Sequence, residues 1–162
     1  MTKHRWFALV LVAAWTSAWS AMPVPLLGAG AGQAQWDSAA IELQVALECR
    51  QRLMASDALR SALGMTNARI GGRYVLPDEL TIFGLPVREV LLDDGLDSGV
   101  ARYAVELPGQ DVIALVRAAS LHRQNGGWQR QTAFGRLSVK ELATGIWLEC
   151  REIPGTSESG RR

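Results

Sequence analysis

The pattern of hydrophobic and polar positions divides the chain into an uncharged N-terminal stretch, a helical region and a mainly extended region. Between residues 37 and 54, apolar residues recur at every fourth position, which is the spacing of one helix face. These positions are Ile41, Val45, Cys49 and Leu53. We therefore predict a helix that starts after an N-cap at Asp37 or Ser38, runs to about Met54 and buries these side chains.

Two shorter helices are predicted from their capping residues. Ser56 and Asp57 are placed to cap the first one, and Gly64 is placed to end it. The second is expected over residues 111–123, and the glycine-rich residues 125–127 are expected to stop it. Its inner stripe is expected to consist of Val112, Leu115, Val116 and Ala119.

Alternation of apolar and polar residues predicts about five strands. They cover residues 73–83, 87–93, 101–107, 129–141 and 146–152. The pair Pro77-Asp78 is expected to form a turn inside the first segment, and residues 84–86 are expected to bend the chain. Gly135 is expected to kink the fourth segment.

The order of these elements predicts an α+β fold, with an antiparallel sheet packed on one face by helices. Two parts of the chain also resemble each other. Gly71-Gly72 and residues 81–84 match Gly126-Gly127 and residues 132–135. The match indicates either two degenerate helix–strand–strand units or a chance similarity between short β segments.

The N-terminal stretch has the pattern of a secretory signal peptide. A positive start precedes an apolar segment, and residues 6–34 contain no Asp, Glu, Lys or Arg. Cleavage is expected after Ala31 or Ala34, whereas an earlier cut near residue 20 and an uncleaved membrane anchor are the alternatives. We therefore expect a signal peptide (residues 1–34), one domain (residues 35–152) in the periplasm or outside a bacterial cell, and a disordered tail (residues 153–162).

Composition and charge exclude several function classes. The chain has 162 residues, of which 17 are basic and 16 acidic, so its formal net charge is +1. A nucleic-acid-binding protein normally shows a strong basic excess, so no nucleic acid is expected as a partner. Neither a phosphate-binding glycine motif nor a serine-hydrolase elbow occurs, and we expect no cofactor and no metal ion.

Cys49 and Cys150 are the two cysteines of the chain. Because both are expected on apolar stripes of an exported domain, we predict that they form a disulfide. This bond closes a loop of about 100 residues, for which the chain-entropy model gives up to about 4.7 kcal/mol of stabilisation. The alternative is a redox-active pair, which lacks the usual Cys-x-x-Cys spacing.

Three groups of polar residues are candidate sites of chemistry. His122 is expected at a helix C-terminus, but the sequence places no nucleophile or carboxylate beside it for acid–base catalysis. The acidic segment 93–99 is predicted to be a solvated turn, because an EF-hand loop starting there would need Glu where Ala104 stands. Arg50 and Arg52 are expected on the solvated side of the first helix.

The last strand supplies the candidate interaction surface. Trp147, Glu149 and Arg151 alternate with apolar residues and are expected to face outward, together with Arg102 of another strand. An outward Trp between charged groups is typical of a binding hot spot. The alternative is that the tail packs over Trp147 or that helices cover this face.

These observations favour a non-enzymatic binding, inhibitor or adaptor module that holds an envelope or secreted protein on an exposed sheet face. A small hydrolase or lyase that uses His122 is one alternative. A structural component of the cell envelope is the other.

Overall fold

The computed structural model describes residues 29–66 and 69–153, and within these ranges the chain forms three helices and seven strands. The helices are α1 (Ala29–Leu47), α2 (Asp57–Ala62) and α3 (Val112–Ala118). The strands are β1 (Gly71–Ile82), β2 (Leu85–Asp93), β3 (Arg102–Pro108), β4 (His122–Gln124), β5 (Gly127–Gln131), β6 (Gly135–Leu142) and β7 (Gly145–Glu152). The predicted α+β class is confirmed, with seven strands in place of about five.

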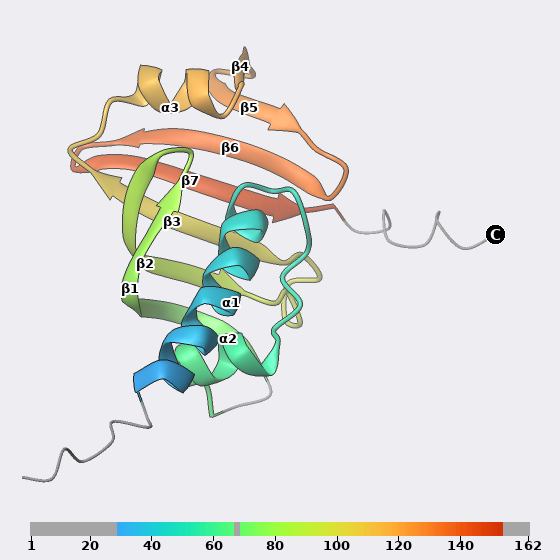
Figure 1. Ribbon diagram of the computed structural model, residues 1–162. Helices are drawn as coiled ribbons and strands as arrows, with labels where there is room; N and C mark the ends of the chain where they lie inside the picture. Colours follow the sequence, from blue (N-terminus) through green and yellow to red (C-terminus); the bar gives the residue numbers. More distant parts are fainter. Residues whose placement is uncertain (1–28, 67–68, 154–162) are drawn as a thin grey trace, which may run out of the picture.

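All seven strands form one antiparallel sheet in the order β1-β2-β3-β7-β6-β5-β4 (Figure 1). Two meanders, β1 to β3 and β4 to β7, meet where β3 pairs with β7. Helices α1 and α2 precede the first meander, and α3 precedes the second. Each half of the sheet therefore follows helical structure, as the interpretation of two related units requires, although the second half has one strand more.

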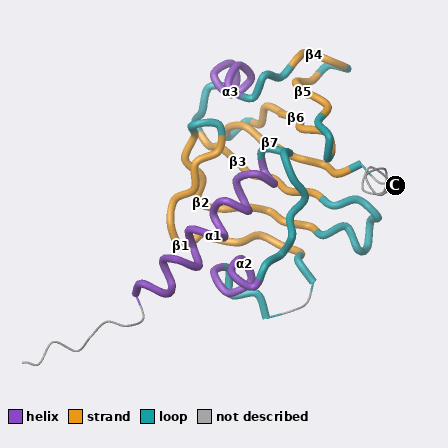
Figure 2. The backbone as a smooth tube through the Cα atoms, turned by 45° about the vertical axis from the view of Figure 1, so that its right-hand side comes forward, coloured by secondary structure: helices purple, strands orange, loops and turns teal. Residues whose placement is uncertain are grey.

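Helix α1 packs against one face of the sheet, and α2 packs against α1 on the same side of the sheet (Figure 2). The largest fully buried side chains come from all three helices and from five strands. They are Leu43, Leu47, Leu59, Ile82, Leu92, Leu107, Leu115, Leu137, Ile146, Leu148, Val90 and Val105. We call the face of the sheet that contributes to this core the inner face, and the opposite one the outer face.

Helix α1 buries a different stripe from the predicted one. Its buried side chains are Trp36, Ala39, Leu43, Ala46 and Leu47. Ile41, expected in the core, is 65% exposed, and Val45 is only half-buried. Residues four apart in an α-helix are rotated by about 40° relative to each other, so a stripe of four such positions turns away from the core.

Helix α1 ends at Leu47 rather than near Met54, because the backbone becomes left-handed at Cys49 (φ 59°). The N–H groups of Cys49 and Arg50 donate to carbonyls three and five residues back, at 3.0 and 2.8 Å. This is the hydrogen-bond pattern of a Schellman motif. Cys49 thus lies beyond the helix, and its disulfide with Cys150 is confirmed, with the two Cα atoms 5.2 Å apart.

Helix α2 follows the prediction. Ser56 is its N-cap and accepts the N–H of Leu59 at 3.2 Å, and Gly64 (φ 62°) follows its C-terminus. The hydroxyl of Ser56 also donates to the carboxylate of Glu42 at 2.5 Å, which ties α2 to α1.

Helix α3 ends at Ala118, five residues earlier than predicted, because Ser120 also takes a left-handed conformation (φ 51°). The chain then enters β4, a strand that was not predicted. His122 therefore lies in this strand and not at a helix terminus. Asn125 and Gly126, with φ of 53° and 79°, form the two-residue turn between β4 and β5 instead of stopping a helix.

Two predicted distortions within strands are connections between strands. Phe83 and Gly84, with φ of 50° and 82°, form the turn between β1 and β2, where a bend was expected. Residues 132–134 connect β5 to β6, so the fourth predicted strand is in fact two. Gly135 is needed for close approach rather than for a kink, because a Cβ atom there would lie 2.3 Å from the carbonyl oxygen of Arg151.

Strand β1 is continuous through the position of the predicted turn. Its pairing with β2 shifts register between Val75 and Leu80, and Pro77 and Asp78 lie within this shift. Proline cannot donate a ladder hydrogen bond, so it is tolerated at such an irregularity. The strand begins at Gly71, two residues before the predicted start.

The predicted signal peptide up to residue 28 and the predicted tail from residue 154 lie outside the described residues. Both expected cleavage points, after Ala31 and after Ala34, fall in the first turns of α1. Within the described ranges, none of the helices combines the length and the hydropathy that crossing a membrane requires.

Candidate functional site on the outer face of the sheet

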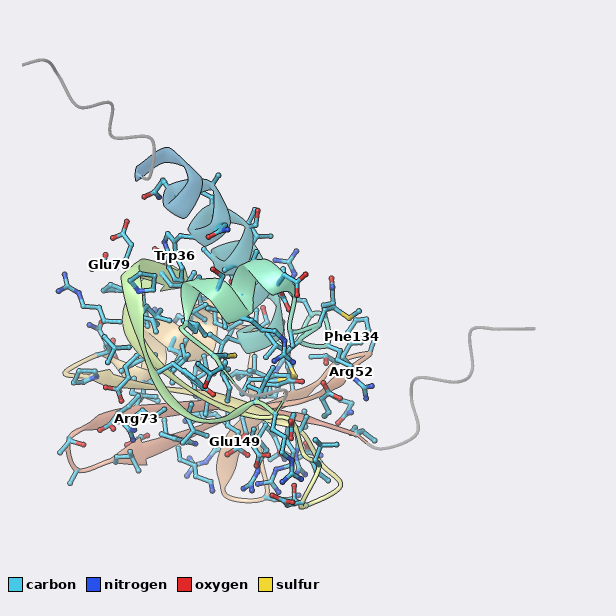
Figure 3. The ribbon with its side chains drawn as sticks, turned by 90° about the horizontal axis from the view of Figure 1, so that it is seen from below. Trp36, Arg52, Arg73, Glu79, Phe134 and Glu149 are labelled. Carbon is cyan, nitrogen blue, oxygen red and sulfur yellow. A yellow bond between two sulfur atoms is a disulfide. The ribbon has the colours of Figure 1, made fainter. Side chains whose placement is uncertain are left out.

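Strand β7 carries the predicted surface residues. Along it, buried positions alternate with half-buried ones, and Trp147, Glu149 and Arg151 are half-buried on the outer face. Figure 3 shows Glu149 and Arg73 on the side of the sheet away from α1 and α2. The helices therefore cover the inner face and leave these outward positions of the central strand accessible.

Three arginines lie side by side at one end of this face. The register places Arg102 of β3 and Arg136 of β6 directly opposite Arg151 of β7, one on each side. Like charges in directly opposed positions repel each other. Asp93 offsets part of this charge, since its carboxylate lies 3.3 Å from the guanidinium of Arg102.

Glu149 connects the two other predicted residues of β7. It accepts a hydrogen bond from the indole Nε1 of Trp147 at 3.3 Å and one from the Nε of Arg151 at 3.2 Å. Its side chain is only 13% exposed. The carboxylate thus satisfies the polar atom of the indole and fixes the orientation of both neighbouring side chains.

Trp147 lies at a different level of the sheet from the arginine row. It is opposite Glu106 of β3 and Lys140 of β6, whereas Arg102 is opposite Arg151. Four residues along a strand correspond to about 13 Å. The four predicted residues therefore share one face, on which Trp147 and the arginine row lie about 13 Å apart along the strand and are linked through Glu149.

Arg136 is the residue of this face that sequence analysis missed. It lies on the same side of β6 as Ser138 and Lys140, at alternate positions. The interpretation of residues 129–141 as one kinked strand hid this relationship. The alternating exposure pattern from residue 136 onward was the signal that would have revealed it.

A shallow groove of about 270 Å³ lies on this face beside the β4–β5 hairpin. Its walls combine the cations Arg136, Lys140 and Arg151 with neutral side chains that both donate and accept hydrogen bonds. These neutral residues are Gln124, Asn125, Gln129 and Ser138. Such a lining suits a ligand with negative charges and with exposed amide or hydroxyl groups.

A second polar cluster lies on the inner side, next to the disulfide. The carboxylate of Glu152, a residue only 7% exposed, accepts hydrogen bonds from the hydroxyl of Tyr103 and, at 2.8 Å, from the guanidinium of Arg52. Burial, and then the hydrogen bond and charge of Glu152, raise the pKa of Tyr103 well above its usual range. Arg52 thus belongs to a tertiary contact and not to the solvated side of a helix.

The acidic loop after β2 is held by the chain itself. Asp94 accepts the backbone N–H groups of Ile70 and Leu96, both at 3.0 Å, and Asp97 pairs with Arg69 at 2.8 Å. Burial opposes ionisation of Asp94, but these two hydrogen bonds and the charge of Arg69 outweigh it and lower the pKa of that carboxyl. The loop thus uses its carboxylates to fix its own backbone.

His122 is exposed on β4, opposite Gln129 of β5. In the described part of the chain, its imidazole makes no hydrogen bond and no ion pair. The structure therefore places no carboxylate or nucleophile against it.

Comparison of the chain with protein-family models, with curated proteins and with solved structures finds no match.

Proposed function

We propose that this protein is an exported binding module that holds a macromolecular partner on the outer face of its sheet. The observation that carries this proposal is the position of Trp147. It lies half-buried on the central strand of a face that α1 and α2 leave uncovered, with charged side chains on both neighbouring strands. Aromatic and arginine side chains supply most of the binding energy at protein interfaces.

The orientation of Trp147 supports its use in binding. Its indole N–H is already bonded to Glu149, so the partner needs to contact only the ring. A ring that is held in place loses little conformational entropy on association, and this makes it an effective anchor.

The disulfide and the predicted signal peptide support action outside the cytoplasm. Disulfides persist mainly in oxidising compartments. Cys49 and Cys150 are paired in the structure, and the chain has no other cysteine. We therefore propose that the partner is an envelope or secreted protein.

The proposal is tested by capture and by affinity measurement. Full-length protein is expressed with its own N-terminal segment, purified after export, immobilised and offered envelope extract. Each retained protein is identified, purified and titrated against the parent protein, Trp147→Ala and Ile41→Ala. Ile41→Ala is the matched control, because it removes an exposed apolar side chain from α1, on the other side of the sheet.

We expect Trp147→Ala to weaken binding by at least about 2 kcal/mol, the size of a hot-spot effect, and Ile41→Ala to leave it unchanged. Equal affinity of the parent and Trp147→Ala for every retained protein would overturn the proposal. Circular dichroism checks that both variants are folded.

A further inference from the structure

The charges of this protein are unevenly distributed. Residues 35–108 contain eleven acidic and seven basic residues, whereas residues 109–145 contain two acidic and five basic ones. The second range covers α3, β4, β5 and β6. Positive charge therefore gathers in the half of the sheet that lies beyond β7.

The two ranges also differ in how their charges are paired. Six of the seven arginines of the first range form ion pairs with carboxylates of the same range or of β7. They are Arg50, Arg52, Arg69, Arg73, Arg88 and Arg102. Within the described residues, no ion pair involves residues 109–145. The exposed cations of the second range are thus not neutralised by a carboxylate of the described part of the chain.

Two of these cations line the groove on the outer face. Arg136 and Lys140 are exposed and lie on the same side of β6, and Arg151 adds a third cation from β7. Glu149, the carboxylate of the groove, is engaged by Arg151 at 3.0 Å. The groove therefore presents a positive charge that the protein itself does not neutralise.

We propose that this groove binds an extended, acidic polypeptide segment of the partner. This inference rests on the proposed binding function of the outer face. The spacing of the cations defines the pattern that it recognises. Arg136 and Lys140 are four residues apart on a strand, about 13 Å. Carboxylates at alternate positions of an extended peptide lie on one side of it, and those four residues apart match this distance.

The neutral residues of the groove favour a peptide over a lipid surface or a nucleic acid. Gln129 and Ser138 offer donors and acceptors, which pair with backbone N–H and C=O groups. Glu149 can accept a further hydrogen bond from a peptide N–H, a donor that phosphate groups lack.

The test measures binding of dye-labelled synthetic octapeptides to the exported full-length protein by fluorescence anisotropy. One octapeptide alternates glutamate and threonine. A second has the same composition with its four glutamates contiguous, and a third alternates lysine and threonine. Binding of the protein to phosphatidylglycerol vesicles is measured separately, by co-sedimentation.

The groove is probed with Arg136→Gln combined with Lys140→Gln. The matched control combines Arg88→Gln with Arg117→Gln, which removes the same charge from exposed positions outside the groove. We expect the alternating acidic peptide to bind the parent most tightly, and the groove variant to bind it at least about tenfold more weakly than the control variant does. Higher salt weakens the interaction.

Three results would overturn this inference. They are equal binding of the two acidic peptides, equal loss in the groove and control variants, and groove-dependent binding of vesicles without binding of the alternating peptide. The test is independent of the Trp147 test. If a partner no longer binds Trp147→Ala but still binds the groove variant, the proposed function stands and the proposed acidic segment is refuted. A partner with the opposite behaviour supports the groove and refutes the role of Trp147.

Discussion

Tyr103 donates its phenolic hydrogen to the carboxylate of Glu152, and both side chains are buried beside the disulfide. Tyr103 is also directly opposite Cys150 in the pairing of β3 with β7. Arg52 reaches the same carboxylate at 2.8 Å from the segment that follows α1. This segment is therefore joined to the end of β7 at two neighbouring points, one covalent and one polar.

The first prediction concerns stability at alkaline pH. An unfolded tyrosine loses its proton near pH 10, whereas burial and Glu152 raise the pKa of folded Tyr103. The stabilisation is thus complete below about pH 10 and decreases as the pH rises further. Denaturant unfolding at about pH 8 and about pH 11 should show a larger loss for the parent than for Tyr103→Phe. Tyr74→Phe is the control, and an identical loss in the parent and Tyr103→Phe would contradict the prediction.

The second prediction concerns Arg52. Replacing it by Ala leaves the buried carboxylate of Glu152 with one partner fewer, and we expect the free energy of unfolding to fall by about 1–3 kcal/mol. Arg88→Ala is the control, because the guanidinium of Arg88 is 83% exposed in its pair with Glu79. Exposed pairs of this kind contribute about 0–1 kcal/mol. Chemical denaturation measures the free energy of unfolding of both variants. Equal losses for Arg52→Ala and Arg88→Ala would assign Arg52 to the solvated surface.

The third prediction concerns the disulfide. Cys49 and Cys150 are separated by 101 residues, so the bond restricts the unfolded chain strongly. Replacing both by Ala should lower the free energy of unfolding by about 2–5 kcal/mol. The parent measured in reductant should approach the value of this variant. If reduction leaves the stability of the parent unchanged, the prediction fails.

The fourth prediction separates the two sides of α1. Leu43 is fully buried, whereas Ile41 is 65% exposed. We expect Leu43→Ala to cost about 2–5 kcal/mol of stability, because it removes methyl groups and leaves a cavity. Ile41→Ala should stay within about 0.5 kcal/mol of the parent. Thermal or denaturant unfolding measures both effects. A larger loss of stability for Ile41→Ala than for Leu43→Ala would support the buried stripe that was expected from the sequence.

Regular alternation was the most informative sequence signal. The outward and inward positions of β7 are as predicted. Capping residues predicted α2 equally well, because Ser56 and Gly64 act through backbone geometry within one turn. These features depend only on neighbours in sequence, so the sequence shows them directly.

Turns and helix ends were predicted less well. Asn125-Gly126 was interpreted as a helix stop, although this dipeptide is typical of a two-residue hairpin turn. Cys49 and Ser120 end helices in a conformation that usually requires Gly, so neither carried a recognisable stop signal. Because these signals were missed, α1 and α3 were predicted to end too late, and β4 was not predicted.

The sequence by itself determined the α+β class, the outward direction of Trp147 and the pairing of the two cysteines. Periodicity is a property of each segment by itself, and two cysteines allow only one pairing within the chain. Only the tertiary structure decided which side of α1 is buried, that Arg136 lies opposite Arg151, and that Arg52 reaches Glu152. Register between strands and the docking of a helix arise from contacts between residues far apart in the chain. No pattern within a single segment encodes them.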